Sequence, residues 1–516
     1  MFQLIGRLPL HYAAARCHYG SLLSLISSGA NVDHQDNDGI TCLHLVCALD
    51  MEGQFTVDYL LHKVSPSLTD VNGFNALHYA AAAGNSSAVH HLLEFRAGDL
   101  LTKAGDQGVT PVHLAAYNGH RDALIILVSR CLNYVDISDA LGRTPLYLAS
   151  VAGKSECVSL LVEKGALVTN NSSKCGMTPV HCAASQGHCD TLQLLLDNTE
   201  EASVVDTPDT SLAATPLMLA AYPGHKSCLE LLLKYGSNPR AVDINGRDAM
   251  MWAVVSGQEE CVRLLLSATQ DTCQMDRRGR SPHHVAAAHG QVIVMGTLLA
   301  TSHKEVTQPD HDGFTPLHYA AYHGQEGTLD MLLQTEYCSA ADTRISTFSP
   351  LHCALVSGSE QCLQLLLSHS SDSVNTADTV GYTPFHIAAA KNLLNSAKLL
   401  VANGANINAK DAKNRTPIML AASKGHVHMI EYLMDEKADY EHSDHDGNTA
   451  LHLACSRAMS KSANLLMRSA STEFVSKQNV DGKTALHLAA GQGLVETTEK
   501  LLGAGASVTV VDAQVS

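Results

Sequence analysis

Histidine and cysteine are the residues of this chain that could support metal binding or acid–base chemistry. There are 29 histidines and 15 cysteines in 516 residues. A neutral imidazole is a common zinc ligand and a general base near neutral pH. Most histidines, however, follow a Thr, Ser or Asn by three residues or lie after a glycine; the first group is His44, His78, His113, His181, His318, His352, His386, His452 and His487. Since imidazole both accepts and donates, we predict that they bond a capping side chain and the neighbouring turn.

The densest cluster of metal-ligating residue types is Cys175, His181, Cys182, His188 and Cys189. Its spacing superficially suggests zinc, which takes Cys and His ligands. His181 and His188 nevertheless occupy recurring positions, and we expect Cys182 and Cys189 on two different helices. We therefore favour scaffold roles for these residues, with zinc as the alternative.

No enzyme motif accompanies these residues. Gly503-Ala504-Gly505 is not a dinucleotide-binding fingerprint, because Val508 stands at the place of the third glycine. The sequence contains no Walker A motif, no Gly-x-Ser-x-Gly elbow and no His-Glu-x-x-His pair. We predict a non-catalytic protein without a cofactor, a metal ion or a small-molecule substrate.

Composition limits the partners and the location. The net charge of −17 repels nucleic acid and anionic lipid. No apolar run approaches the roughly 18 residues of a membrane-spanning helix, and Met1-Phe2-Gln3-Leu4-Ile5 does not open a signal peptide. The cysteines fall mostly within predicted helices instead of forming a compact disulfide framework. We expect a soluble intracellular protein, cytoplasmic and/or nuclear, that does not insert into membranes.

The elements that position these residues are repeated units. One unit runs from Asp310 to Leu333 and contains Asp-His-Asp-Gly-Phe-Thr-Pro-Leu-His-Tyr-Ala-Ala. Fifteen copies are spaced 33 to 35 residues apart, with one gap of 37. A fixed period of this size predicts a stacked solenoid. The residues aligned with Thr315 are Leu8, Thr41, Asn75, Thr110, Thr144, Thr178, Thr215, Asp248, Ser281, Thr315, Ser349, Thr383, Thr416, Thr449 and Thr484.

Each unit predicts a helix, a turn and a second helix. Asp-x-x-Gly is turn chemistry, Thr is a helix N-cap, and Pro suits the first helical position. A Gly such as Gly187 then ends the first helix. A second apolar helix follows, as in the segment 228–233. We predict an all-α solenoid of about fifteen helix-turn-helix repeats with β-turn or hairpin tips, in one continuous array over residues 1–516.

Several units depart from this pattern. Residues 203–214 replace a regular turn, and we expect an exposed loop there. The eighth unit, near 247–270, loses both the cap and the histidine at Arg247–Trp252. Units near 381–404 and 447–470 lose the glycine between the helices. Drift in a tolerant scaffold, or a partner-contact or hinge site, would explain these departures.

The two ends of the sequence lack the polar faces expected of terminal repeats. Met1, Phe2, Leu4 and Ile5 are apolar, and the last unit ends at Gly505-Ala506-Ser507-Val508 without a capping helix. We expect that the chain is part of a longer array.

The units resemble ankyrin repeats. The resemblance rests on Thr-Pro-Leu-His-x-Ala-Ala, on Gly-His pairs such as Gly187-His188, and on Gly-Ala-Asn endings such as Gly404-Ala405-Asn406. It covers nearly the whole chain. It implies a binding scaffold without catalytic activity.

The order of the irregular units resembles the C-terminal half of the regulatory ankyrin repeat subunits of protein phosphatase 6. The segments concerned are 348–354 with Asp342-Thr343-Arg344-Ile345 before it, 447–456, 491–496 and 501–506. This resemblance implies a scaffold that joins the phosphatase 6 catalytic subunit and a SAPS-domain regulatory subunit and helps select substrates. The alternatives are a generic ankyrin adaptor for cytoskeletal or membrane proteins, and an ankyrin segment of a larger enzyme or channel.

We expect protein partners to contact the first helices and the turn tips. The candidate tip residues are Asn37, Asp38, Asn72, Arg277, Arg278, His311, Asp312, His445 and Asp446. Asn375 and Asn408 lie eight residues after Leu367 and Leu400, each behind Val or Ile. They resemble the asparagine that is hydroxylated in other ankyrin repeats.

Overall fold

The structure is a computed structural model, and it divides the chain into two compact units, residues 1–270 and 271–516. It describes residues 6–49, 54–101, 103–130, 132–170, 173–199, 201–269, 274–301, 304–336, 348–369, 373–469 and 471–513. The irregular turn predicted at 342–345 lies outside these ranges. Each unit is described by itself below, and the single array over residues 1–516 stays a prediction.

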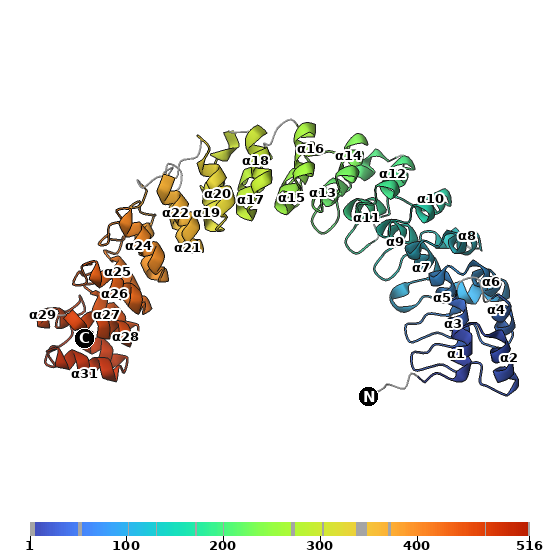
Figure 1. Cartoon of the computed structure of the whole chain (residues 1–516), viewed down its shortest axis with the longest axis horizontal. Coiled ribbons are helices and arrows are strands. Elements are labelled where there is room, and N and C mark those ends of the chain that lie inside the picture. Colours follow the sequence, from blue (N-terminus) through green and yellow to red (C-terminus); the bar gives the residue numbers. More distant parts are fainter. Residues whose placement is uncertain are drawn as a thin grey trace. The chain divides into compact units, whose positions relative to one another are not determined.

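The first unit contains eight helix pairs within its described residues (Figure 1). The first helices are α1 (Pro9–Ala15), α3 (Cys42–Cys47), α5 (Ala76–Ala83), α7 (Pro111–Asn118), α9 (Pro145–Val151), α11 (Pro179–Gln186), α13 (Pro216–Ala221) and α15 (Ala249–Ser256). The second helices are α2 (Tyr19–Ser27), α4 (Gln54–Leu61), α6 (Ser86–Leu101), α8 (Arg121–Arg130), α10 (Ser155–Glu163), α12 (Cys189–Asp197), α14 (Lys226–Lys234) and α16 (Glu259–Thr269). Short 3₁₀ turns are η1 (Asp106–Gly108), η2 (Leu132–Tyr134) and η3 (Ala202–Asp206).

The second unit contains seven helix pairs within its described residues. The first helices are α17 (Pro282–His289), α19 (Pro316–Tyr322), α21 (Pro350–Ser357), α23 (Pro384–Lys391), α25 (Pro417–Lys424), α27 (Ala450–Ser456) and α30 (Ala485–Gly491). The second helices are α18 (Val292–Thr301), α20 (Glu326–Leu333), α22 (Glu360–His369), α24 (Leu394–Ala402), α26 (Val427–Asp435), α28 (Ser460–Leu466) and α31 (Val495–Gly503). A short extra helix, α29 (Thr472–Val475), and the turns η4 (Lys304–Val306) and η5 (Met467–Ser469) complete the unit.

The helices start where the repeat alignment predicts. All fifteen aligned residues, from Leu8 to Thr484, are the N-caps of first helices. At Thr144, for example, Oγ1 accepts the Tyr147 N–H at 3.1 Å, and Pro145 takes the first helical position. Pro lacks only an N–H that would have no partner inside the helix. The predicted capping is therefore confirmed.

In nine repeats, a histidine three residues after the cap links the repeat to the next one. Nδ1 of His386 accepts the Thr383 backbone N–H at 3.1 Å, which leaves the ring proton on Nε2. Nε2 then donates to the carbonyl of Arg415, in the next repeat, at 3.1 Å. The same bridge joins His11–Ile40, His44–Phe74, His78–Val109, His113–Arg143, His181–Ala214, His284–Phe314, His352–Tyr382 and His452–Lys483. The predicted role is confirmed for seven of the nine predicted histidines.

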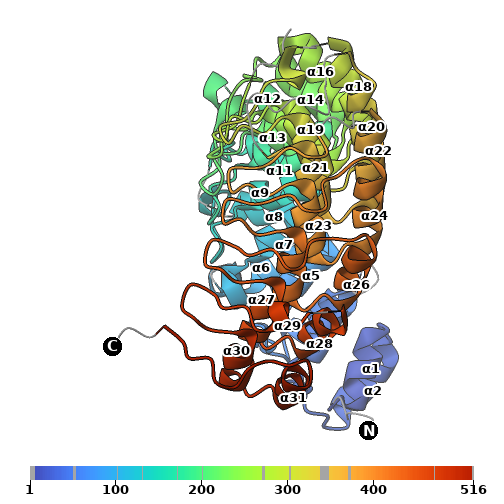
Figure 2. The same ribbon diagram turned by 90° about the vertical axis from the view of Figure 1, so that its left-hand side faces the viewer.

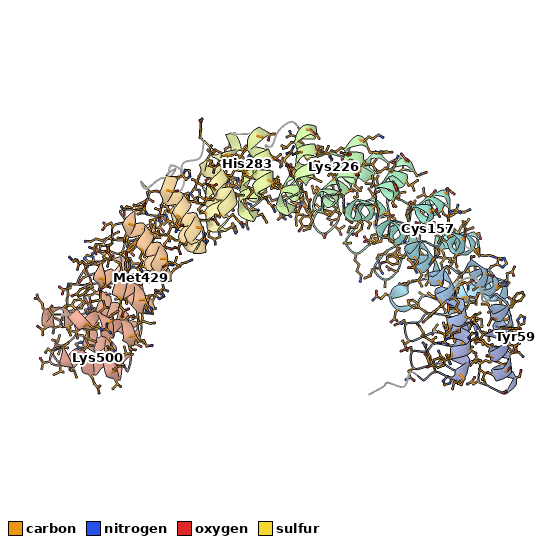
Figure 3. All side chains as sticks on the ribbon, in the orientation of Figure 1. Tyr59, Cys157, Lys226, His283, Met429 and Lys500 are labelled. Carbon is orange, nitrogen blue, oxygen red and sulfur yellow. The ribbon has the colours of Figure 1, made fainter. Side chains whose placement is uncertain are left out.

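Each unit has two helix layers and a row of turn tips. In the second unit, α19, α21 and α23 form one layer, and α20, α22 and α24 form the other (Figure 2). The core between the layers is mostly Leu, Ala, Val and Cys, and it includes Met429 of α26 (Figure 3). The tips are hydrogen-bonded turns, and the described residues contain no strand. Within the described ranges no helix has the length and apolar character needed to cross a bilayer.

Successive tips are held in register by the backbone. His311 donates its N–H to the Arg278 carbonyl at 3.0 Å, and Ala412 donates to the Val380 carbonyl at 3.0 Å. A Cβ at Gly381, where φ is +83°, would lie 2.5 Å from the Ala412 nitrogen. Glycine therefore permits both the turn and the close approach of the next tip.

The prediction that the eighth repeat loses its cap is wrong. Oδ1 of Asp248 accepts the Met251 N–H at 2.9 Å, so Asp takes over the role of Thr. Met251 replaces the histidine, as expected. Because Asp248 is only 3% exposed, burial raises the pKa of its carboxyl to about 6.

The expectation of an exposed loop at 203–214 is only partly correct. Residues up to Asp206 form η3, which buries Val204 and Val205. Asp209 then closes a widened tip by accepting the Ala214 N–H at 2.9 Å. Within the segment, Ser203, Pro208 and residues 210–212 are exposed. The segment folds back because Val204 and Val205 are apolar and become buried when η3 packs against the repeats.

The two repeats that lack the glycine between their helices still form the same turn. Asn392 has a φ of +60° and Ala458 a φ of +57°, so each takes the left-handed conformation. Asn adopts this conformation more readily than Ala does, because its short polar side chain can bond locally. Packing against neighbouring repeats is therefore strong enough to hold Ala458 in an unfavourable conformation.

The buried histidines predict a pH-dependent stability. Burial lowers the pKa of His44, His78, His113, His181, His284, His352, His386 and His452, that of His78 to about 4. Below pH ~6.5 the unfolded chain takes up protons that the folded chain refuses, so stability falls with pH. We expect a loss of about 2 kcal/mol between pH 7.5 and pH 5 for each histidine that stays neutral. Asp248 acts in the opposite direction, but it is a single group.

The measurement is the thermal midpoint of the full chain by circular dichroism across this pH range. His386→Gln should reduce the decline, whereas His445→Gln, at an exposed tip, should leave it unchanged. A midpoint that is constant from pH 7.5 to pH 5 would contradict the assignment of these histidines as buried and neutral.

Candidate functional site

In each unit, the first helices and their tips form a surface that we call the first-helix face. None of the fifteen first helices that the structure describes contains Asp or Glu. Their polar residues are mainly His, Ser, Tyr, Asn, Gln and Lys. The acidic residues lie on the second helices and in the turns. The exposed part of the first helices is therefore free of the negative charge that dominates the composition.

The second unit has a pocket of about 460 Å³ on this face. Three successive repeats contribute to it, through their tips and through α19 and α21. We call it the aromatic pocket. It is lined by Arg278, Arg280, Asp312, Phe314, His318, Tyr319, Tyr322, His323, Phe348 and Cys353.

The turn before α19 positions the pocket wall. Oδ1 of Asp310 accepts the Phe314 N–H at 2.8 Å, and Oδ2 accepts the Tyr319 hydroxyl at 2.8 Å. Burial, followed by the bond to Asp310, raises the pKa of Tyr319, so the phenol stays protonated and donates. One buried carboxylate thus fixes both the tip and a ring of the pocket.

The rings of the pocket pack against one another. Phe314 makes edge contacts with His318 at 5.6 Å and with Phe348 at 6.4 Å between ring centroids. Tyr322 makes an edge contact with His323 at 5.2 Å, yet 51% of its surface is exposed. Edge-to-face packing holds the rings while leaving Tyr322 open to a partner.

Both charges and apolar surface border the pocket. Arg280 is paired with Asp276 at 2.7 Å, so its charge is balanced locally. Arg278 and Asp312 are exposed and form no ion pair among the described residues. Burial, and then the neighbouring His289, lower the pKa of His323. The pocket therefore offers apolar contact, one free cation and one free carboxylate.

The first unit has a smaller group of the same kind on α13 and α15. Tyr222, which is half exposed, contacts Trp252 edge-on at 5.9 Å. Trp252 donates to Asp243 Oδ2 at 3.1 Å, and Arg247 lies over its ring at 5.3 Å. Trp252 thus takes the place of Tyr319 in the tenth repeat and bonds the turn carboxylate in the same way.

The structure brings some of the predicted tip residues together and not others. All nine are exposed. Arg278 and Asp312 line the aromatic pocket, with Arg277 and His311 beside them on the same two tips. Asn37, Asp38 and Asn72 lie on tips of the first unit, and His445 and Asp446 lie on a later tip of the second unit. No observation tests whether any of them contacts a partner.

Asn375 and Asn408 occupy equivalent exposed positions in consecutive repeats. Oδ1 of Asn375 accepts the Asn406 N–H at 2.7 Å, and Oδ1 of Asn408 accepts the Asp439 N–H at 2.9 Å. Asp33 bonds the Ser65 N–H in the same way at 2.8 Å. These side chains join one repeat to the next, and their hydroxylation stays a prediction.

The residues of the Cys/His cluster have scaffold contacts. His181 bonds Thr178 and the Ala214 carbonyl, and His188 bonds the Val151 carbonyl at 3.1 Å. Among the described residues, the ligand atoms that lie close enough for a metal ion belong to His90, His91 and Glu94 instead. The twelve cysteines in the described part of the chain are free thiols.

Sequence reasoning missed the aromatic residues of the pocket. The available signal was Phe or Tyr just before the cap, and Tyr four and seven residues after it, in the tenth repeat. A second group, Tyr382, Arg415, Lys424 and Arg457, was also missed, because its members come from three repeats.

Comparison with known proteins identifies the repeats. A family model described as ankyrin repeats (3 copies) matches residues 10–104, 43–138, 84–172, 112–207, 206–276, 269–345, 337–411 and 409–477. A model described as ankyrin repeat matches residues 481–513.

Curated relatives match parts of the chain. Human transient receptor potential cation channel subfamily A member 1 is 29% identical over 24% of this chain and 15% of its own length. The probable E3 ubiquitin-protein ligase XBOS32 of Oryza sativa subsp. japonica is 28% identical over 23% of this chain and 30% of its own. Palmitoyltransferase AKR1 of Lachancea kluyveri is 33% identical over 23% of this chain and 16% of its own length. The matched region thus spans less than a third of each relative.

Solved structures match as well. The ankyrin repeat domain of Bcl-3 is 28% identical and covers 43% of this chain and 98% of its own, with a TM-score of 0.37. The human ASB11 ankyrin repeat domain is 29% identical, and the match covers 45% of this chain and 100% of the ASB11 chain, with a TM-score of 0.39. The family-model matches extend over nearly the whole chain. This chain belongs to the ankyrin repeat family.

Proposed function

We propose that this chain is a non-catalytic scaffold that acts as a regulatory, substrate-recruiting subunit of a protein phosphatase 6 complex. Its partners would be the catalytic subunit and a SAPS-domain regulatory subunit. The phosphatase assignment rests on the resemblance of the irregular repeats, and its location would be the cytoplasm and/or the nucleus. The observation that carries the scaffold function is the aromatic pocket on the first-helix face.

The pocket has the composition of a protein-binding site. Aromatic rings and arginine are the residues that most often supply the binding energy of interfaces. Tyr322 offers a ring that is half exposed and already held by His323. Arg278 and Asp312 would form the polar rim, where charges favour the correct partner and the association rate. A volume of about 460 Å³ suits the side chains of a protein segment.

A second candidate is a generic ankyrin adaptor, or the ankyrin segment of a channel or an enzyme. It is favoured by the matches to a cation channel, a ubiquitin ligase and a palmitoyltransferase, each over about a quarter of this chain. Peptide mapping of the endogenous protein distinguishes the two. Membrane-spanning or catalytic sequence outside residues 1–516 would favour the alternative that this chain is the ankyrin segment of a channel or an enzyme.

The test is capture of partners from cell lysate by the tagged full chain, quantified by mass spectrometry. We expect the phosphatase 6 catalytic subunit together with a SAPS-domain subunit. Tyr322→Ala and Arg278→Glu should each reduce their recovery about tenfold, because loss of an interface anchor typically costs more than ~1 kcal/mol. Both side chains are exposed, so the fold should persist.

Ile293→Ala is the matched control, because this side chain is exposed on the second helix α18 of the same unit. It should leave recovery unchanged. If the phosphatase is captured equally by all variants, the aromatic pocket is not its contact site. If the wild-type chain captures no phosphatase 6 subunit, the phosphatase assignment is wrong.

We also propose that Asn375 and Asn408 are hydroxylated in cells. Both are exposed, and both lie in the turn after a second helix. Tryptic peptides from protein isolated from cells should carry the added mass of one oxygen atom at each asparagine. The peptide that contains Asn198, an exposed residue at the end of α12, serves as the control. Unshifted masses for both peptides would refute the proposal.

A further inference from the structure

The second unit contains another pocket of about 430 Å³ on its first-helix face, which we call the cation pocket. Its walls come from α23, α25, α27 and the tips beside them, which pack side by side (Figures 1 and 2). The residues that matter are Tyr382, Arg415, Ser423, Lys424, Arg457 and Met459. Three basic side chains converge there in a chain whose net charge is −17.

The repeat register explains why cations meet at this place. Lys391, Lys424 and Arg457 are each 33 residues apart and occupy the same position, at the end of a first helix. Stacked helices lie roughly 8–10 Å apart, so the three cations form a row. The same position holds His289, His323, Ser357 and Gln492 in the other repeats of this unit. The row of permanent cations is therefore confined to three consecutive repeats.

Two of these cations are available to a ligand. Lys424 and Arg457 are exposed, and neither forms an ion pair within the described ranges of the chain. Lys391, at the edge, donates to the Val356 carbonyl. A cation at a helix C-terminus gains some stability from the helix dipole. The helix dipole favours a cation at each helix end separately. It does not account for the placement of two exposed cations in one pocket together with Tyr382.

Arg415 has a different role, because its charge is already balanced. Nε of Arg415 donates to Asp411 Oδ2 at 2.8 Å, and Nη2 of Arg415 donates to the Tyr382 hydroxyl oxygen at 2.8 Å. Tyr382 also stacks on His386 with 5.6 Å between centroids. Because the hydroxyl oxygen accepts from Arg415, its own proton is left to donate to a ligand. Arg415 is thus a positioning residue for Tyr382.

Nearby carboxylates do not fill the pocket. The helices α23, α25 and α27 contain no Asp or Glu. Oδ1 of Asp378 accepts the Tyr382 N–H at 2.7 Å, and Oδ1 of Asp444 accepts the Asn448 N–H at 2.7 Å. These acids bond their own turns, and among the described residues no carboxylate forms an ion pair with Lys424 or Arg457.

We propose that Lys424, Arg457 and Tyr382 bind the phosphate group of a phosphorylated Ser or Thr in a protein segment that lies along the first-helix face. A phosphate carries a charge of about −1.5 to −2 and three acceptor oxygens, which match two cations and one hydroxyl donor. Arg457 can present two parallel N–H groups to it. The acidic chain as a whole disfavours membranes and nucleic acid, which are extended arrays of phosphates. This site does not depend on the assignment to phosphatase 6.

The test is fluorescence anisotropy of the full chain with labelled degenerate peptides that have phosphoserine fixed at the centre. The same pools with serine or glutamate at that position are the comparison. We expect the phosphoserine pool to bind at least about tenfold more tightly than the serine pool, with affinity that falls as salt rises. Lys424→Glu with Arg457→Glu should abolish that preference. Tyr382→Phe should weaken phosphopeptide binding about threefold to tenfold, as expected for the loss of one hydrogen bond.

Lys461→Glu is the control, because it makes the charge change of one of these two substitutions on the exposed surface of the second helix α28. It should leave phosphopeptide binding unchanged. Equal binding of phosphoserine and serine pools, or an equal loss with Lys461→Glu, would overturn the proposal. Binding of phosphatidylserine vesicles or of RNA in place of the phosphopeptides would also overturn it. Because only purified chain and peptides are present, the result is independent of whether the chain captures a phosphatase.

Discussion

The buried bridge from a first-helix histidine to the next repeat is the interaction on which the rest of the structure depends. Each imidazole accepts from the backbone of its own helix cap and donates to a carbonyl about 30 residues later, as His386 does to Arg415 at 3.1 Å. A single ring therefore fixes the helix start, the distance to the next repeat and the position of the next tip. Such a ring is neutral, because Nδ1 needs its lone pair to accept the backbone N–H of its own cap.

Register within the stack also determines the chemistry of the surface. Once neighbouring repeats are fixed, a residue type that recurs at one position becomes a row on the face. Among the described residues the first helices lack Asp and Glu, so the part of the first-helix face that they form carries no acidic side chain, although the net charge of the chain is −17. On that face the rings around Tyr322 and the cations Lys424 and Arg457 mark two places with different ligand chemistry.

The fold could be predicted because each repeat carries its own helix signals. The caps, the prolines and the histidine bridges are local or lie one repeat apart, so alignment alone located all fifteen helix starts. Asp248 was misjudged because the expected residue was Thr, although Asp caps helices as well. The segment at 203–214 was misjudged because the burial of Val204 and Val205 depends on the apolar surface that neighbouring elements offer. The division into two units at residue 270 has no signal in the repeat period.

The candidate sites were harder to predict than the fold. Arg278 and Asp312 were predicted as contact residues because tips are the usual contact points. That they line one pocket with Phe314 and Phe348 follows only from the stacking of three repeats. Likewise Tyr382, Arg415, Lys424 and Arg457 are scattered over 76 residues of sequence and meet only in the stack. A periodic sequence reveals which positions share a row; side-chain packing decides which of them form a pocket.

The most direct test of this account is the protonation state of the bridging histidines. A nitrogen-15 and proton correlation spectrum of the histidine-labelled full chain, recorded from pH 7.5 to pH 5.5, reports the tautomer of each ring. We expect a set of neutral rings with the proton on Nε2 that do not titrate in this range. Bridging rings that carry the proton on Nδ1, or that become charged while the chain remains folded, would contradict it.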